Sequence, residues 1–192
     1  FDELSRKLVS DLNKGALMAA YVGHGLPNTF DEVVYRESWY SIGHTRDMAA
    51  VNVKTGKPLF LSFACYTGAF DSEDGVPSIA EKLALNPLGP IAVFASSRAS
   101  HPYPNSLYAR RIIDHFLAKQ PKTIGDGLLA VKAALQDSRN PVAETLVQVE
   151  VTPLRNEHVG LYNLLGDPAT QLRYPKHAQV AIRRDVSRHL RA

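Results

Sequence analysis

Three short, almost uninterrupted apolar runs constrain the fold of this chain more than any other feature. They cover residues 16–22, 58–65 and 90–96, and each is about as long as a β-strand. Strands that are covered by helices on both faces of a parallel sheet have this character, because neither face of such a strand meets water. The runs therefore predict an α/β fold with a mostly parallel sheet.

Helical signals surround these runs. Leucine recurs every fourth residue from Leu4 to Leu12, and Gly15 is placed where a glycine ends a helix. Ser78 with Glu81 forms a capping-box pattern between the second and third runs, and the strand–helix–strand unit there is expected to cross over right-handed.

Two further helices are expected after the third run. One is predicted to start at Asn105, as its cap, and the next begins around Thr123. Alternation across residues 144–151 favours a strand, with a continued helix as the alternative. Residues 159–174 suggest a short strand or helix, a Gly-Asp-Pro turn and a final strand. In the long connection after residue 25, Trp39 and Tyr40 are interpreted as a plug in the core.

Length and charge limit the classes of function that fit this chain. A chain of 192 residues with 45% hydrophobic residues is long enough for one domain with a sizeable core, predicted to span residues 1–174. The net charge of +3 comes from the end of the chain, so residues 175–192 are interpreted as a basic tail or linker. The remainder is close to neutral, which argues against a nucleic-acid partner. No run is long enough for a membrane span.

Polar residues follow all three runs. His24 comes after the first, Cys65 ends the second, and Ser96, Ser97 and Arg98 end the third. Ligands of such sheets sit beyond the carboxyl ends of the strands. We therefore expect an imidazole, a thiol and a polar patch at one edge of the sheet.

A thiol beside an imidazole suits nucleophilic catalysis. Histidine stabilises the thiolate of a cysteine and then protonates a leaving amine. The N–H groups of Gly25 and Cys65 are candidate donors to a developing oxyanion, since a glycine leaves room for substrate. The plainer interpretations stay open at this stage: Cys65 as a small core residue, and His24 as a turn histidine on the surface.

Other chemistries fit less well. His24, His44, Cys65 and His101 lack the short spacings of a metal site, so no cofactor is predicted. Residues 71–75, "DSEDG", resemble a fragment of a calcium loop; a polar loop is the preferred interpretation, with a structural calcium ion as the alternative. The Gly-x-Ser-x-Gly motif of serine hydrolases is absent.

Four blocks of the sequence, taken in order, resemble the gingipain-type cysteine peptidases of the caspase-like clan. They are "AAYVGHG", "PLFLSFACYTGAFD", "SIAEKLALNPLGPIAVFASSR" and "LYNLLGDPATQL", which together extend across residues 17–172. The resemblance implies a caspase-like three-layer sandwich, with helices on both faces of the sheet. It also implies a cysteine endopeptidase that works through an acyl-enzyme.

Carried over by position, the resemblance assigns roles to the residues at the strand ends. His24 and Cys65 would be the catalytic dyad, and Gly25 with the backbone of Cys65 the oxyanion hole. Asp167 would hold a structural turn. The substrate-binding residues would be Gly23, Ser96, Ser97 and Arg98. Taken by itself, Arg98 is interpreted as the end of a strand in solvent.

The family domain has further strands ahead of this region, including one with an acidic residue that orients the histidine. The chain therefore resembles the C-terminal part of a catalytic domain, and the expected partners are a protein or peptide substrate and the rest of a longer polypeptide. A secreted or cell-surface bacterial protein is the location that the resemblance favours. The alternative function is a catalytically degenerate caspase-like module that acts as a scaffold or interaction domain.

Overall fold

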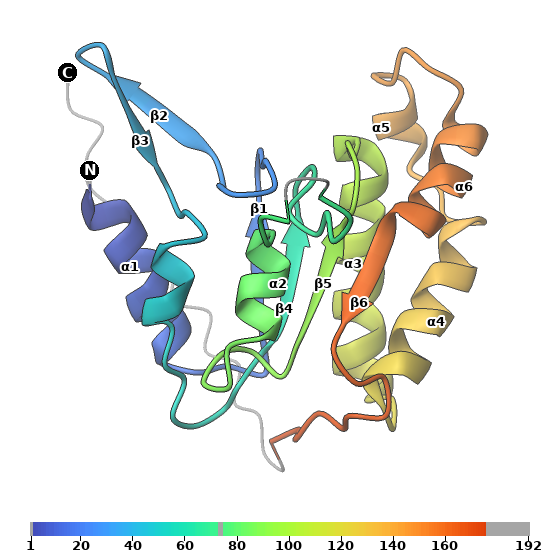
Figure 1. Ribbon diagram of the computed structural model, residues 1–192. Helices are drawn as coiled ribbons and strands as arrows, with labels where there is room; N and C mark the ends of the chain where they lie inside the picture. Colours follow the sequence, from blue (N-terminus) through green and yellow to red (C-terminus); the bar gives the residue numbers. More distant parts are fainter. Residues whose placement is uncertain (1, 73–74, 176–192) are drawn as a thin grey trace, which may run out of the picture.

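A computed structural model describes residues 2–72 and 75–175 of the chain, and a four-stranded sheet lies at its centre (Figure 1). The strand order is β1 (Met18–Val22), β4 (Leu59–Phe63), β5 (Ala92–Ser96) and β6 (Tyr162–Leu165). The first three are parallel, and β6 pairs antiparallel with β5. The predicted α/β fold with a mostly parallel sheet is confirmed.

The three predicted strands are not equally buried. Every residue of β4 and β5 is buried, as the apolar runs require. By contrast β1 is at the edge of the sheet, with Ala20 and Val22 exposed to solvent. The expectation of burial on both faces is therefore wrong for β1.

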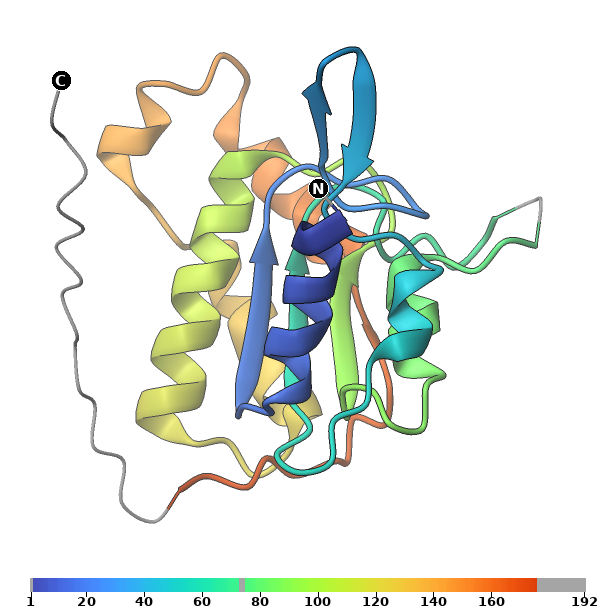
Figure 2. The ribbon, with the colours of Figure 1, turned by 90° about the vertical axis from the view of Figure 1, so that its left-hand side faces the viewer.

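Helices cover both faces of the sheet and give the three layers that were predicted (Figure 2). On one face α1 (Asp2–Asn13) and α2 (Ile79–Ala84) pack through a cluster that includes Leu12, Ile79 and Phe60. On the other face α3 (Pro102–Lys119), α4 (Ile124–Leu135) and α6 (Val151–Leu161) form a cluster around Phe94, Tyr108 and Tyr162. Within the described residues no helix is both long and apolar enough to span a bilayer.

Two of the helix starts are as predicted and one is not. The capping box of Ser78 and Glu81 is present, and Thr123 caps α4. The third helix starts three residues earlier than Asn105. Pro102 is its first residue, where a fixed φ and a missing N–H do no harm, and the His101 ring accepts from the Tyr103 N–H as the cap. Asn105 is thus inside the helix, and it is buried.

The long connection between β1 and β4 contains a β-hairpin that the sequence did not indicate. Strands β2 (Glu32–Tyr35) and β3 (Ser38–Ser41) pair antiparallel across a two-residue turn, and a short 3-10 helix, η1 (Asp47–Ala50), follows. Trp39 is 69% exposed on this hairpin, so its interpretation as a core plug is wrong. Phe30 and Met48 take the core positions of the connection.

The C-terminal third differs from the predicted strands. Residues 144–151 form no strand; the short helix α5 (Pro141–Glu144) leads through a turn to α6. After β6 the Asp167 side chain accepts from the Ala169 N–H, as a turn residue does. No strand follows it up to residue 175, and the predicted basic tail lies outside the described residues except for its first residue.

Candidate active site

His24 and Cys65 come to one pocket because their strands are neighbours. Val22, the last residue of β1, is in register with Phe63, the last residue of β4, and each candidate follows two residues later. The pocket has a volume of about 430 Å³. Besides this pair it is lined by Val22, Gly23, Phe63, Ser100, Pro102, Asn105, Ser106 and Ala109.

The sulfur of Cys65 is half-buried against the loop that follows β5. It accepts a hydrogen bond from the Ser100 N–H at 3.2 Å, and the thiol donates to the Ser100 carbonyl at 3.4 Å. The chain turns sharply just after the cysteine, since Tyr66 has a left-handed φ of 57°. The Tyr66 N–H donates to the Arg98 carbonyl at 3.0 Å, which ties this turn to the same loop.

The imidazole of His24 is held less firmly. The Tyr21 hydroxyl donates to the His24 carbonyl at 2.9 Å and accepts from the Asp31 N–H at 3.0 Å, so the backbone of the turn is fixed. The side chain itself is exposed. In the part of the chain that the structure describes, no group hydrogen-bonds to its ring.

Gly25 is required by a close approach of the two strand-end loops. A Cβ placed there would lie 2.6 Å from the Thr67 methyl group and 2.9 Å from the Cys65 carbonyl oxygen. The sequence predicted a glycine here to leave room for substrate. The structure adds a second reason, because a side chain at this position would clash with the Cys65 loop. At Gly23 a Cβ would meet only the end of the Tyr21 side chain, at 2.7 Å.

Two backbone donors belong to the two candidate loops: Cys65 lines the pocket, and Gly25 follows His24 and lies against the Cys65 loop. Among the described residues neither the Gly25 N–H nor the Cys65 N–H has a hydrogen-bond partner in the protein. Both glycines of the His24 turn adjoin the pocket or the cysteine loop. The oxyanion role of Gly25 and Cys65 stays a prediction, and it is chemically open to them.

The predicted substrate-binding residues after β5 do not line this pocket, whereas Gly23 does. Ser96 and Ser97 are buried, and their hydroxyls donate to the carbonyls of Arg98 and Leu161. The Arg98 guanidinium donates two hydrogen bonds, of 2.9 and 2.5 Å, to the Asp71 carboxylate. This guanidinium holds the pKa of the Asp71 carboxyl below its usual range. Arg98 thus connects the loop after Cys65 to the loop after β5, rather than simply ending a strand. A role of Ser96, Ser97 and Arg98 in substrate binding stays a prediction.

Sequence reasoning missed the residues that surround the thiol. Ser100, Asn105 and Tyr162 form a hydrogen-bonded series that ends at the sulfur. A signal for the helical part was available, because small and polar residues recur on one face of α3 at positions 102, 105, 106 and 109. All four line the pocket.

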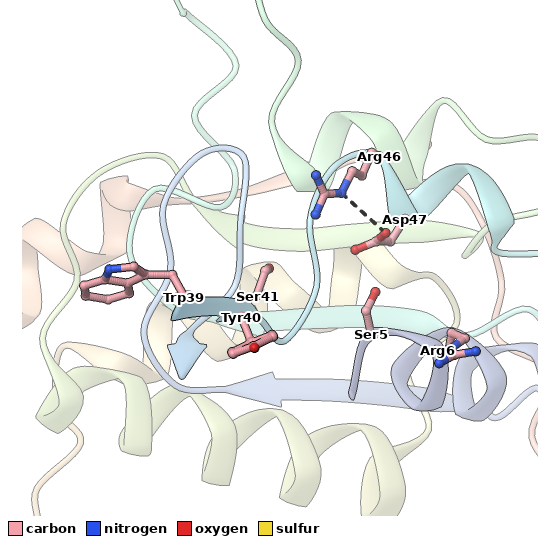
Figure 3. Close-up of a pocket in the computed structure, with 7 residues that line it drawn as sticks. All are labelled: Ser5, Arg6, Trp39, Tyr40, Ser41, Arg46 and Asp47. Carbon is pink, nitrogen blue, oxygen red and sulfur yellow. Dashed lines mark ion pairs between the residues drawn. The ribbon is translucent and has the colours of Figure 1, made fainter. Parts of the chain in front are cut away.

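A second hollow lies elsewhere, between α1, the β2–β3 hairpin and the segment before η1 (Figure 3). Its volume is about 450 Å³, and it contains none of the predicted site residues. The dashed line in Figure 3 marks a long ion pair, 3.9 Å, between Arg46 and Asp47. Within the described residues no cluster of three or more His, Cys, Asp or Glu side chains is arranged to hold a metal. Residues 73–74 of the candidate calcium loop lie outside them, so that alternative stays a prediction.

Comparison with known proteins identifies one family and several similar folds. The family model of peptidase family C25 matches residues 1–173. The fold is similar to the crystal structure of the Arg specific cysteine proteinase gingipain R, with a TM-score of 0.63, 18% identity, and coverage of 88% of this chain and 36% of that chain. A complex of the pro- and mature domains of Porphyromonas gingivalis RgpB gives a TM-score of 0.62 and 19% identity, covering 88% of this chain and 37% of that one.

A third solved structure, described as a protease, has a TM-score of 0.63 and 17% identity over 85% of this chain and 37% of its own. This chain therefore spans little more than a third of the solved chains that it matches. No match was found among the curated proteins. These likenesses confirm the caspase-like α/β fold that the sequence predicted.

Proposed function

Because this chain belongs to peptidase family C25, we propose that it carries the Cys65 nucleophile and the His24 base of a cysteine endopeptidase. The observation that carries the proposal is the shared pocket: two neighbouring parallel strands deliver a thiol and an imidazole to its wall. Neither residue type in isolation would support catalysis, but together they are the pair that thiol hydrolysis needs.

In the first half of the reaction Cys65 Sγ attacks the carbonyl carbon of the scissile bond, while His24 takes the thiol proton. The carbonyl oxygen becomes an oxyanion, and the N–H groups of Gly25 and Cys65 donate hydrogen bonds to it. The tetrahedral intermediate then collapses and the C–N bond breaks. His24 returns its proton to the leaving amine, and the acyl group remains on sulfur as a thioester.

In the second half a water molecule replaces the amine. His24 accepts a proton from the water as its oxygen attacks the thioester carbon, and the same two N–H groups hold the second oxyanion. The C–S bond breaks, the carboxylic acid product leaves, and Cys65 recovers its proton from His24. Both halves use the same four groups, all of which belong to this chain.

The residues that line the pocket bear on substrate choice. Val22, Phe63, Pro102 and Ala109 present an apolar wall beside the dyad, and no Asp or Glu is among the lining residues. The arginine specificity named for gingipain R is therefore not carried over to these residues. A protein or peptide substrate is proposed, with an apolar side chain near the bond that is cut.

The partners and the cellular location of this chain are proposed by analogy with the family alone. One solved relative is a complex of pro- and mature domains, which supports further domains of a longer polypeptide as partners of this chain. A secreted or cell-surface location, a bacterial source, the absence of a nucleic-acid partner and the absence of a cofactor stay predictions.

The proposal is tested by labelling the full-length protein with a peptidyl acyloxymethyl ketone, a reagent that traps reactive peptidase thiols. Cys65 is the only cysteine of the chain, so Cys65→Ala removes the one site in this region that the reagent can modify. We expect labelling and peptide cleavage that disappear in Cys65→Ala, and a cleavage rate that falls about 10²- to 10⁴-fold in His24→Ala.

The matched control is Ser10→Ala, which removes an exposed hydroxyl on α1 away from the pocket and should leave both signals unchanged. A folded full-length protein that shows neither labelling nor cleavage dependent on Cys65 would overturn the enzyme assignment. That result is the one expected of a degenerate scaffold module.

A further inference from the structure

The sulfur of Cys65 stands at the end of a series of hydrogen bonds that starts in the core. The Tyr162 hydroxyl donates to Asn105 Oδ1 at 2.7 Å, and Asn105 Nδ2 donates to Ser100 Oγ at 3.0 Å. Ser100 then contacts Cys65 Sγ three times: its N–H at 3.2 Å and its hydroxyl at 3.9 Å donate to the sulfur, and its carbonyl at 3.4 Å accepts from the thiol. Three parts of the chain that are distant in sequence meet in this series: Cys65, the segment 100–105 and Tyr162.

We propose that Asn105 is a positioning residue for the thiol: anchored by Tyr162, its amide orients the Ser100 hydroxyl toward the sulfur of Cys65, so that the loop stabilises a thiolate there. The inference deepens the proposed function, on which its catalytic meaning rests, and it concerns three residues to which no role has been assigned above.

The direction of the series follows from its buried end. Tyr162 has no exposed surface, and this burial raises the pKa of its phenol, so the hydroxyl stays protonated and acts as a donor. Asn105 must then turn its oxygen to Tyr162 and its NH₂ group to Ser100. Because Ser100 Oγ accepts from that NH₂ group, its own hydrogen is left to donate, and its acceptors are the Cys65 sulfur at 3.9 Å and the Tyr162 phenol oxygen.

The N–H and the hydroxyl of Ser100 favour the charged form of the sulfur, since hydrogen bonds to an ionised acceptor are stronger than those to a neutral one. The Ser100 carbonyl holds the proton of the neutral thiol until His24 takes it. Asn105 belongs to the first turn of α3, and the positive end of this helix dipole acts in the same sense. Asn105 is 8% exposed, so water competes little for its amide. If Asn105 served packing alone, its amide would not need to accept from Tyr162 and donate to Ser100, toward the sulfur.

The loop that carries Ser100 is itself fixed on its far side. The His101 N–H donates to Nε2 of the buried His158 at 2.8 Å, and Nδ1–H of His158 donates to the Leu154 carbonyl at 2.7 Å. Ser100 is thus held between Asn105 and the segment anchored on α6. This arrangement keeps its N–H on the sulfur without help from substrate.

The test measures the rate at which iodoacetamide alkylates Cys65 as a function of pH, in the full-length protein and in variants. Asn105→Asp has the same shape but no hydrogen to donate, so its carboxylate takes the Ser100 hydroxyl hydrogen and adds a like charge near the sulfur. We expect the midpoint of its pH–rate profile to rise by about one pH unit, with about a tenfold slower reaction at neutral pH.

Two further variants keep the test decisive if Asn105→Asp does not fold. Tyr162→Phe keeps the buried ring and removes only the donor, and Ser100→Ala keeps the N–H and removes only the hydroxyl. Both should move the midpoint in the same direction by a smaller amount. Ser10→Ala, which removes an exposed hydroxyl from α1 away from the pocket, is the control and should match the parent. With a peptide substrate, Asn105→Asp, Tyr162→Phe and Ser100→Ala should each lower kcat and leave KM unchanged.

The outcomes separate the two proposals. If the folded variants keep the parental alkylation profile, the positioning role is wrong, even where the protein cleaves peptides through Cys65. If the profile moves in a protein that cleaves no peptide, the positioning role holds and the proposed peptidase activity fails.

Discussion

The two sides of the pocket are built very differently. The thiol side is made by β4 and β5, whose residues are all buried, and its loop is fixed by Asn105 and His158. The imidazole side is made by β1, an edge strand with two exposed residues, and within the described residues the His24 ring has no hydrogen-bond partner.

This difference shows which part of the proposed chemistry the chain supports by itself. A nucleophile needs an environment that stabilises its charge, and we propose that Ser100 and Asn105 supply one. A general base also needs a group that fixes the orientation of its ring. In the described chain, the turn around His24 positions the backbone only. We test this contrast first through the free energy of unfolding, because the two sides of the pocket differ most in how deeply their residues are buried.

The largest effect is expected from the pair of residues that end the two strands. Phe63 is 2% exposed and packs near the Tyr162 ring, with centroids 6.0 Å apart, while its registered neighbour Val22 is 71% exposed. Phe63→Ala should lower the free energy of unfolding by about 3–5 kcal/mol. Val22→Ala should change it by less than about 0.5 kcal/mol. Urea unfolding measures both, and equal losses would contradict the contrast.

A smaller effect is expected where the two sides touch. Gly25→Ala forces a Cβ against the Cys65 loop, so it should lower the free energy of unfolding by about 1–3 kcal/mol, as overpacking does. Gly23→Ala is the matched change on the His24 side, and it meets only the end of the Tyr21 side chain. Its cost should be lower in the same urea experiment. A greater loss in Gly23→Ala would mean that the His24 turn is the more tightly packed one.

The smallest effect is a pH dependence on the thiol side. Burial lowers the pKa of His158, which accepts from the His101 N–H as a neutral ring. The unfolded chain takes up a proton below about pH 6.5 that the folded state resists, so stability is lost as the pH falls from there. The slope is at most about 1.4 kcal/mol per pH unit.

His158→Gln should remove that slope. His115→Gln, a change on α3 away from the pocket, is the control and should keep it. Thermal unfolding at a series of pH values from 5 to 8 measures the difference. A parental slope that survives in His158→Gln would assign the acid sensitivity to another group.

The parts of the fold that the sequence predicted are those with strong local signals. Continuous apolar runs fixed β4 and β5, and side-chain caps fixed the starts of α2 and α4. The β2–β3 hairpin was missed because its turn, Arg36 and Glu37, takes a positive φ at both residues without the Asn-Gly pair that usually announces one. The alternation of residues 144–151 predicted a strand wrongly: Asn140 and Pro141 start the short helix α5 just before it, and the segment 145–150 connects this helix to α6.

The candidate site divides in the same way. The ends of parallel strands lie at one edge, so the meeting of His24 and Cys65 could be foreseen from the order of the runs. The contacts of Ser100, Asn105 and Tyr162 could not, because they arise between elements whose separation depends on the packing of α3 and β6. The half-exposed state of β1 was equally hidden, since its composition matches that of its buried neighbours.

The antiparallel direction of β6 gives the thiol a late partner. Since β6 runs opposite to β5, its first residue, Tyr162, is in register with Ser96 at the edge where β4 ends. During synthesis Cys65 therefore leaves the ribosome long before the tyrosine that anchors its support, and domains fold as units once their chain is available. The thiol of a nascent chain therefore lacks the support proposed for it until nearly all of this sheet has been made.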